Sequence, residues 1–378
     1  MPLIEGALYG HLKGGTSFLD AYIRANINMK TISIVSSQLQ LINCVEYLSG
    51  INSMDNNLIL CATSRERMEQ MNKLLSSECY NNFFVKKYRC SLTGFRLLDF
   101  FLQYYILFKI RLISLLSSCD IAICGMYMMA THKQLFRYIK VRNPETKFVV
   151  VDDGTATLQI VNERKKELSG DIPKMFTGNR FLTSYFRKNI SCYITHSLCF
   201  YSVYDLDLSL CDTYSFNSYF FIKNNIKNIN ININSEILDC DILILGQPMY
   251  KLGYVSLVTY IKYIKTLSAM YRDKKIVYYS HPFEHICPWD INDKEMSNVF
   301  FVKNDISIEL LSLLLGERDI CIYGFTSSAL YNMKETNKGL NVKSIWLDEK
   351  DVNDKEVFRT FQICYQEFVK KGIEVLAL

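Results

Sequence analysis

From Met29 onward, short runs of apolar residues alternate with longer segments in which apolar positions recur at helical spacing. In the first half of the chain these runs fall at residues 31–35, 57–63, 119–125 and 147–154. Runs of Val, Ile and Leu without polar alternation are typical of parallel strands that helices cover on both faces. This half therefore predicts a doubly wound α/β domain.

The rhythm stops at residues 222–236, an Asn-, Ile- and Lys-rich stretch that fits either an exposed edge strand or a linker. Apolar runs then resume at 241–248, 274–282, 298–304, 319–328 and 343–349. The sequence thus predicts an α/β fold of two Rossmann-like domains, 29–225 and 236–378, facing each other across a cleft, with a C-terminal helix able to pack back on the first domain. Residues 1–28 share no periodicity with the rest and are expected to form an N-terminal extension.

Composition narrows the class of protein. Hydrophobic residues make up 49% of the chain and charged residues 21%, as in globular proteins that bury a large core. Lys and Arg number 43 against 38 Asp and Glu, and a net charge of +5 is too small to indicate a nucleic-acid partner. The 13 Cys residues are scattered through apolar runs, which favours buried thiols in the reducing cytoplasm over a disulfide framework.

Residues 100–118 form the most apolar long segment, but Lys109 and Arg111 interrupt it. No uninterrupted apolar run reaches about 18 residues, so the protein is expected to be neither exported nor membrane-spanning. One interpretation is a basic amphipathic helix on an anionic membrane surface, which would make the protein peripheral on the cytoplasmic face of the inner membrane. The commoner structure for such a segment is a core-facing helix whose two cations reach solvent.

Ligands of open α/β sheets bind beyond the carboxyl ends of the strands, and the sequence places an acidic pair there. Asp152 and Asp153 directly follow an apolar run, and Gly154 permits a tight turn after them. One carboxylate can face the cleft as a general base toward a hydroxyl while the other supports the loop. Asp and Gly are also ordinary turn formers, so a solvated turn explains the same residues.

A histidine and a proline end an apolar run in the second half of the chain. His281 is followed by Pro282, which fixes the backbone at that point. An imidazole there can donate to a phosphate oxygen or protonate a leaving group. A lone His is more often structural.

Two further strand ends carry residues suited to a nucleotide. Thr326, Ser327 and Ser328 open a predicted helix, where hydroxyls and free N–H groups favour an anion, although a plain helix cap needs no ligand. Gly246 allows close approach to the backbone and Gln247 can read a base edge, although a turn accounts for both. With a base in one domain and a phosphate site in the other, the four strand ends together suit sugar transfer from a nucleotide donor to a hydroxyl.

The order of these motifs resembles that of the bacterial sialyltransferases of the lipooligosaccharide sialyltransferase and polysialyltransferase type. The carrying residues are Asp-Asp-Gly, then His-Pro about 130 residues later, then a Ser pair about 45 residues beyond. The segment SIVSSQLQLINCVEYL is also similar to the opening of those families, in which the residues corresponding to Ser36, Ser37 and Gln38 line the cleft. The resemblance covers the chain from about Met29 and implies a GT-B fold.

The resemblance also implies an inverting transfer from CMP-sialic acid, the donor substrate, to a hydroxyl of a glycan. It assigns Asp153 as the base with Asp152 in support, and His281 to the phosphate and departing group. The same phosphate would be held by Ser327, Ser328 and Thr326, and the nucleotide by Gly246, Gln247 and Pro282. No cofactor and no metal are implied, in keeping with the absence of a closely spaced His/Cys set in the sequence.

Several alternatives stay open. The donor sugar is sialic acid, another CMP-activated nonulosonic acid, Kdo or a UDP-sugar. The acceptor is a terminal galactoside or a growing polysialic chain in an O-antigen, lipooligosaccharide or capsule, free or lipid-linked. A non-enzymatic module that binds a nucleotide or glycan at the inner membrane surface would show the same motifs without turnover. Neither oligomeric state nor linkage can be inferred from the sequence.

Overall fold

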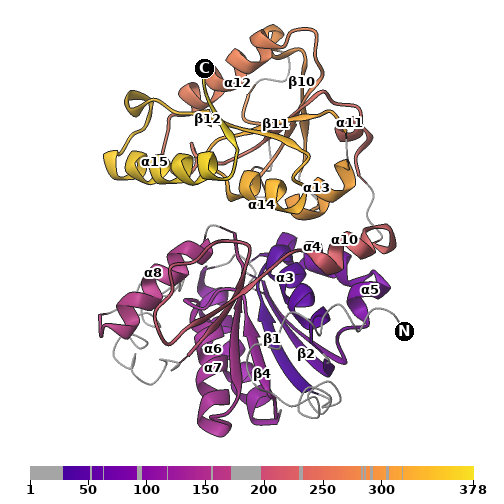
Figure 1. Ribbon diagram of the computed structural model, residues 1–378, viewed down its shortest axis with the longest axis vertical. Coiled ribbons are helices and arrows are strands. Elements are labelled where there is room, and N and C mark those ends of the chain that lie inside the picture. Colours follow the sequence, from indigo (N-terminus) through magenta and orange to yellow (C-terminus); the bar gives the residue numbers. More distant parts are fainter. Residues whose placement is uncertain are drawn as a thin grey trace, which may run out of the picture.

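The computed structural model describes residues 29–51, 53–62, 64–91, 96–116, 118–154, 156–171, 197–229, 233–281, 284, 287–289, 293–303, 306–316 and 318–378. The expected extension, residues 1–28, and the predicted site residue Pro282 lie outside this part of the chain. The described residues form two parallel sheets with helices on both faces, stacked one above the other (Figure 1). The predicted α/β fold of two Rossmann-like domains is confirmed.

The first domain is built on a sheet that has seven parallel strands within the described residues, in the order β3-β2-β1-β4-β5-β6-β7. Its strands are β1 (Met29–Val35), β2 (Ser53–Ala62), β3 (Lys86–Ser91), β4 (Ile121–Cys124), β5 (Lys147–Val151), β6 (Cys199–Ser202) and β7 (Thr213–Phe216). Its helices are α3 (Gln38–Ser49), α4 (Arg65–Leu75), α5 (Glu78–Asn81), α6 (Arg96–Leu116), α7 (Ala130–Arg142), α8 (Ala156–Leu168) and α10 (Phe220–Asn225). The central strands β1, β4 and β5 are almost wholly buried, because helices cover both faces of the sheet.

The second domain is built on a sheet that has six parallel strands within the described residues, in the order β10-β9-β8-β11-β12-β13. Its strands are β8 (Ile242–Leu245), β9 (Ile276–Tyr279), β10 (Val299–Val302), β11 (Cys321–Gly324), β12 (Asn341–Trp346) and β13 (Glu374–Ala377). Its helices are α11 (Ser235–Leu238), α12 (Leu257–Met270), α13 (Ile308–Leu315), α14 (Ser328–Thr336) and α15 (Lys355–Lys370), with 3-10 turns η3 (Lys294–Met296) and η4 (Glu349–Asp351).

A serine begins several of the helices that follow strands. Ser37, Ser64, Ser256, Ser307 and Ser327 each occupy the position before the first helical turn, and each side chain accepts a hydrogen bond from a backbone N–H of that turn. Such caps satisfy donors that the helix itself leaves unpaired. Hydroxyl groups are thereby placed at the start of α3, α13 and α14, close to the strand ends.

The described parts of the linker region, 222–229 and 233–236, contain helical turns and no edge strand, which was one of the two interpretations of this region. Helix α10 is followed by a 3-10 turn, η2 (Ile226–Asn228), and α11 precedes the second sheet. The buried carboxylate of Glu46 accepts from the backbone N–H groups of Phe221 and Ile222, at 2.9 and 2.7 Å, and so fixes α10 to the first domain. The chain therefore crosses between the domains after α10.

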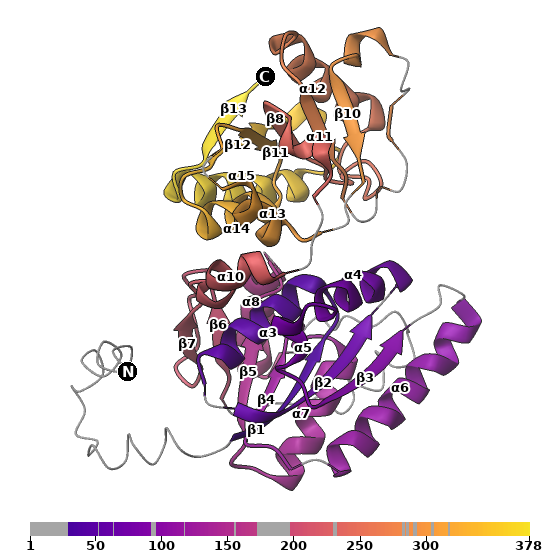
Figure 2. The same cartoon turned by 90° about the vertical axis from the view of Figure 1, so that its right-hand side faces the viewer.

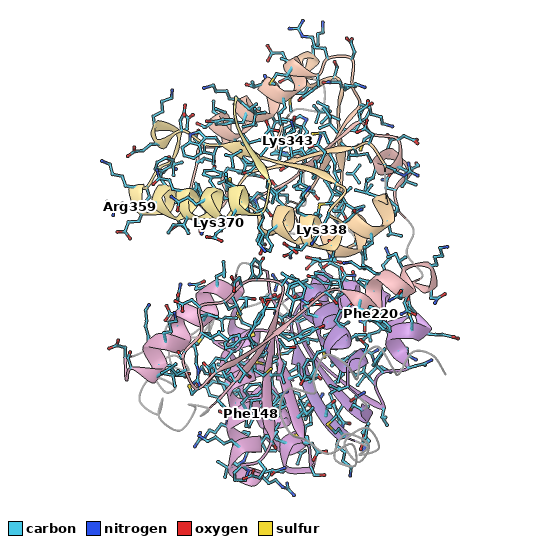
Figure 3. All side chains as sticks on the ribbon, in the orientation of Figure 1. Phe148, Phe220, Lys338, Lys343, Arg359 and Lys370 are labelled. Carbon is cyan, nitrogen blue, oxygen red and sulfur yellow. The ribbon has the colours of Figure 1, made fainter. Side chains whose placement is uncertain are left out.

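The two domains meet through helices. Helices α13 and α14 form the lower side of the second domain and face α3, α4 and α10 of the first, as both views show (Figures 1 and 2). Figure 3 places Lys338, just after α14, and Phe220, at the start of α10, on the facing sides of the two domains. Helix α15 packs on the sheet of its own domain, where the ring of Trp346 contacts those of Phe358 and Tyr365.

A charged network is buried in the first domain between α7, α8 and the segment before β7. The ammonium group of Lys133 pairs with Glu167, whose other oxygen accepts from Arg164 at 2.8 Å and from the Tyr127 hydroxyl at 3.0 Å. Arg164 also pairs with Asp212 at 3.1 Å. The two cations and two anions balance, so each buried charge has the partner that burial requires. The network ties both helices to the edge of the sheet.

Candidate active site

A cavity of about 240 Å³ lies between the two domains, at the carboxyl ends of β1, β5, β8, β9 and β11. The first domain lines it with Ser37, Gln38, Leu39, Arg67, Gln70 and Asp153. The second domain lines it with Leu245, Gly246, Tyr279, Ser280, His281, Ile306, Ser307, Ile308, Glu309, Ser327, Ser328, Ala329 and Asn332. A larger hollow of about 880 Å³ between α12 and η3 contains none of the strand-end residues. We therefore take the interdomain cavity as the candidate active site.

The two carboxylates after β5 lie in different surroundings. Asp152 is 1% exposed, and its oxygens accept from the Ser202 hydroxyl at 2.6 Å and the Val203 N–H at 2.7 Å. Burial raises the pKa of Asp152 to about 7, although both hydrogen bonds oppose that shift. Asp153 lines the cavity instead, and the Ser37 hydroxyl donates to it at 3.2 Å. Of the acidic pair, only Asp153 can meet a ligand there.

Gly154 brings the acidic turn against the other domain. Its φ of +66° lies in the left-handed region that favours glycine. A Cβ at this position would lie 2.9 Å from the hydroxyl oxygen of Ser328, so a side chain would displace that hydroxyl. The glycine thus allows Asp153 and the start of α14 to sit on opposite walls of one cavity.

His281 follows β9 and lines the cavity from the second domain. Burial lowers the pKa of His281 to about 4, and the positive charges of Arg67 and Lys251 add to this. The imidazole is therefore neutral at pH 7 while the cavity is empty, and an anion beside it would favour protonation. Its backbone N–H donates to the Glu284 carboxylate at 2.9 Å, which fixes the turn.

Gly246 lines the cavity, but packing also explains why glycine stands there. A Cβ would lie 2.5 Å from a carboxylate oxygen of Glu284 and 2.8 Å from the Tyr278 hydroxyl. The same hydroxyl donates to Glu284 at 2.8 Å. A glycine at position 246 therefore leaves room for the buried hydrogen bonds that support the turn at His281, and this requirement holds without any ligand.

The start of α14 presents hydroxyls to the cavity. Ser327 and Ser328 line it, and the Ser327 hydroxyl accepts from the Ala329 N–H at 3.2 Å. Thr326 and Gln247 lie behind them and are not among the lining residues; the Gln247 amide donates to the Thr326 hydroxyl at 3.3 Å. Two hydroxyls at a helix start, beside a positive helix end, form a site suited to a phosphate.

Two of the three residues expected to line the cleft after β1 do line the cavity, and the third does not. Ser37 and Gln38 line the cavity. Ser36 does not, because its N–H and hydroxyl both donate to the side-chain oxygen of Gln40, at 2.8 and 3.1 Å. Its polar groups serve the first turn of α3.

Sequence reasoning missed two charged residues of the cavity. Glu309, at the start of α13, is 3% exposed and accepts from the Asn332 amide at 2.7 Å; burial raises its pKa, and the charge of Asp153 adds to this. The sequence did contain a sign of this site, because Glu309 is the one charged residue in the apolar run ISIELLSLLLG. Arg67 reaches the cavity from α4, and nothing in the charged segment RERMEQMNKLL distinguishes it from Arg65.

A tyrosine joins the acidic turn to α14. Tyr204 comes two residues after Ser202, the hydrogen-bond partner of Asp152. Its ring stacks on that of Tyr331, with centroids 4.5 Å apart, and its hydroxyl donates to Asn332 at 3.1 Å. The connection runs from the first domain to the helix that carries Ser328.

Two kinds of feature are absent from the described part of the chain. The described residues contain no group of three or more His, Cys, Asp or Glu side chains placed to hold a metal ion. None of their helices combines the length and the apolar character needed to cross a membrane.

Solved structures with similar coordinates define the class of fold. The chain is similar to UGT73P12 of Glycyrrhiza uralensis, which was solved with glycyrrhetinic acid 3-O-monoglucuronide. The match has a TM-score of 0.56 at 10% identity and covers 93% of this chain and 81% of that one. A putative UDP-N-acetylglucosamine 2-epimerase of Listeria monocytogenes matches at a TM-score of 0.52 and 12% identity, covering 88% of this chain and 82% of that one. At such identities the likeness concerns the fold alone, and the fold is GT-B.

The family follows from the sequence. Residues 31–345 match the family model described as "Alpha-2,8-polysialyltransferase (POLYST)", and the chain belongs to this family. It is therefore a glycosyltransferase of the sialyltransferase kind. A comparison with curated proteins gave no match.

Proposed function

We propose that the protein transfers sialic acid from CMP-sialic acid to a hydroxyl group of a glycan, with inversion at the anomeric carbon. Family membership supports the sialyl group. The observation that carries the proposal is the division of the cavity, with Asp153 on the wall of the first domain and His281, Ser327 and Ser328 on the wall of the second. A base and a phosphate site that face each other suit displacement at a carbon placed between them.

The proposed reaction is a single displacement. The acceptor oxygen forms a bond to the anomeric carbon while the bond from that carbon to the phosphate oxygen breaks, and the electron pair leaves with CMP. The acceptor proton passes to Asp153, which Ser37 orients. The charge that develops on the phosphate is stabilised by the hydroxyls of Ser327 and Ser328, by the start of α14 and by His281. The proposal needs no metal.

Arg67 supports a donor sugar that carries a carboxylate. It is the cation among the described lining residues, and it lies on the wall opposite Ser327 and Ser328. A guanidinium group there can pair with the carboxylate at the anomeric carbon of sialic acid. Other CMP-activated nonulosonic acids and Kdo carry the same group. A neutral sugar delivered by UDP would offer Arg67 only the diphosphate and no carboxylate on the sugar.

The acceptor is proposed from the family description. It favours a growing α-2,8-linked sialic acid chain over a terminal galactoside. We propose that this chain belongs to a bacterial capsule. We place the reaction in the cytoplasm, where CMP-activated donor and lipid-linked acceptor would meet at the inner membrane.

One assay tests donor, acceptor and metal together. The purified protein is incubated in EDTA with CMP-sialic acid, CMP-Kdo or a UDP-sugar, each with oligosialic acid or a terminal galactoside, and the products are read by mass. We expect extension of oligosialic acid from CMP-sialic acid, undiminished by EDTA. Release of a nucleotide from UDP-sugars alone would contradict the donor. If the protein bound CMP but released no nucleotide from any donor, it would be a binding module and not an enzyme.

A further inference from the structure

The outer helix of the first domain, α6, has two apolar faces. Ile106, Ile110 and Ile113 point into the core and are 5% exposed or less. This confirms the core-facing interpretation for one side of the helix. The opposite side carries six large apolar side chains that are between 43 and 63% exposed: Phe101, Tyr104, Tyr105, Phe108, Leu112 and Leu115. We call these six residues the α6 stripe.

The α6 stripe is continuous along the helix. At about 100° per residue, its members fall within an arc of about 100° on the side away from the isoleucines. Helix α6 itself runs along the outer edge of the first domain, beside β3 (Figure 2). The solvent side of an ordinary surface helix is polar, and an apolar patch of this kind indicates an interaction surface.

Cations border the α6 stripe on both sides. By the same helical spacing, Lys109 lies on one flank and Arg111 on the other. Lys109 is held by the Arg89 carbonyl at 3.3 Å, and Arg111 by the face of the Tyr138 ring at 5.7 Å. In sequence, β3, α6 and α7 together carry ten Lys and Arg against one acidic residue, whereas the whole chain has 43 against 38. Lys133 is buried and paired with Glu167, and the other nine cations make these three elements strongly positive.

We propose that α6 docks the protein on an anionic lipid bilayer, with the stripe inserted at the headgroup level and the flanking cations on the lipid phosphates. An apolar stripe bordered by Lys and Arg is the pattern of helices that lie in the plane of a membrane surface. A second copy of the chain fits less well, because two such faces would bring rows of like charge together. The proposal does not depend on the reaction proposed above.

The test is sedimentation of the full-length protein with vesicles of phosphatidylcholine, with and without phosphatidylglycerol. We expect binding to the anionic vesicles that weakens as salt is raised. The double variant Phe108→Ser/Leu112→Ser should bind at least about tenfold more weakly, since each side chain loses its burial in lipid. Lys109→Gln/Arg111→Gln should lose the preference for anionic vesicles.

A matched control separates the stripe from general stickiness. Val258 on α12 and Ile363 on α15 are 79 and 61% exposed, and Val258→Ser/Ile363→Ser should bind vesicles as the wild type does. Nucleotide release with a soluble acceptor and the unfolding temperature should be unchanged in all variants. Equal vesicle binding by the stripe variant and the wild type would overturn the proposal. So would a concentration-dependent dimer, measured without lipid, that the stripe variant abolishes.

Discussion

The substitution Asp153→Asn tests the proposed base with the least disturbance of the structure. Asparagine has the same shape and keeps an oxygen that can accept from Ser37, so the 3.2 Å hydrogen bond survives. Loss of a general base slows a reaction about 10² to 10⁴-fold, which corresponds to about 3 to 5 kcal/mol of barrier. Folding stability should change by less than about 1 kcal/mol, the contribution of one hydrogen bond.

The assay combines nucleotide release, CMP binding and thermal unfolding. We expect turnover to fall at least about 100-fold while CMP affinity stays within about twofold, because the proposed phosphate site lies on the other wall of the cavity. Asp205→Asn is the matched control, since Asp205 is exposed and does not line the cavity. More than about a tenth of wild-type turnover in Asp153→Asn would refute the assignment and direct attention to Glu309.

Three further predictions concern charge. The pKa of His281 is about 4 in the empty cavity, and an anionic ligand raises that pKa. CMP binding should therefore take up a proton, and CMP affinity should rise as pH falls from 7 to 5. Calorimetry in two buffers can measure both effects, which should be larger in the wild type than in His281→Asn. Arg67→Gln should raise KM for CMP-sialic acid about tenfold or more while CMP affinity changes little, and an equal loss for both would place Arg67 on the phosphate. Glu167→Gln removes the shared partner of Lys133 and Arg164 in the interior and should cost about 3 to 5 kcal/mol in the free energy of unfolding by denaturant. Glu69→Gln, which breaks an exposed pair with Arg65, should be nearly silent in the same measurement.

The sequence predicted every inner strand of the two sheets except β6, and of the edge strands it predicted only β10. Central strands such as β5 read KFVVV, because both faces are buried. The first sheet ends on one side in β3, KKYRCS, and on the other in β7, TYSF, which are polar and partly exposed. The short strands β6 and β13 also escaped prediction. An edge strand needs no continuous apolar run, so its pattern resembles that of a loop.

For the candidate site, the strand-end rule located the cavity and several of its lining residues, but not the roles of those residues. It located Asp153, His281 and Ser327, because parallel strands deliver their carboxyl ends to one place. It could not distinguish Asp152 from Asp153, since the difference arises from Ser202, which is 50 residues away in sequence. Arg67 could not be predicted from the sequence for a related reason. It enters from a helix, and only the packing of α4 decides which of its cations faces inward.

The Tyr204 contact has a consequence for how the two domains are held in register. Asp152 binds Ser202 and Val203, and the next residue, Tyr204, rests on Tyr331 and Asn332 of α14. Tyr204 therefore helps to set the distance between the two walls of the cavity. A change in the length of the linker should therefore affect the distance across the cavity less than truncation of the Tyr204 side chain, which would remove its contacts with Tyr331 and Asn332.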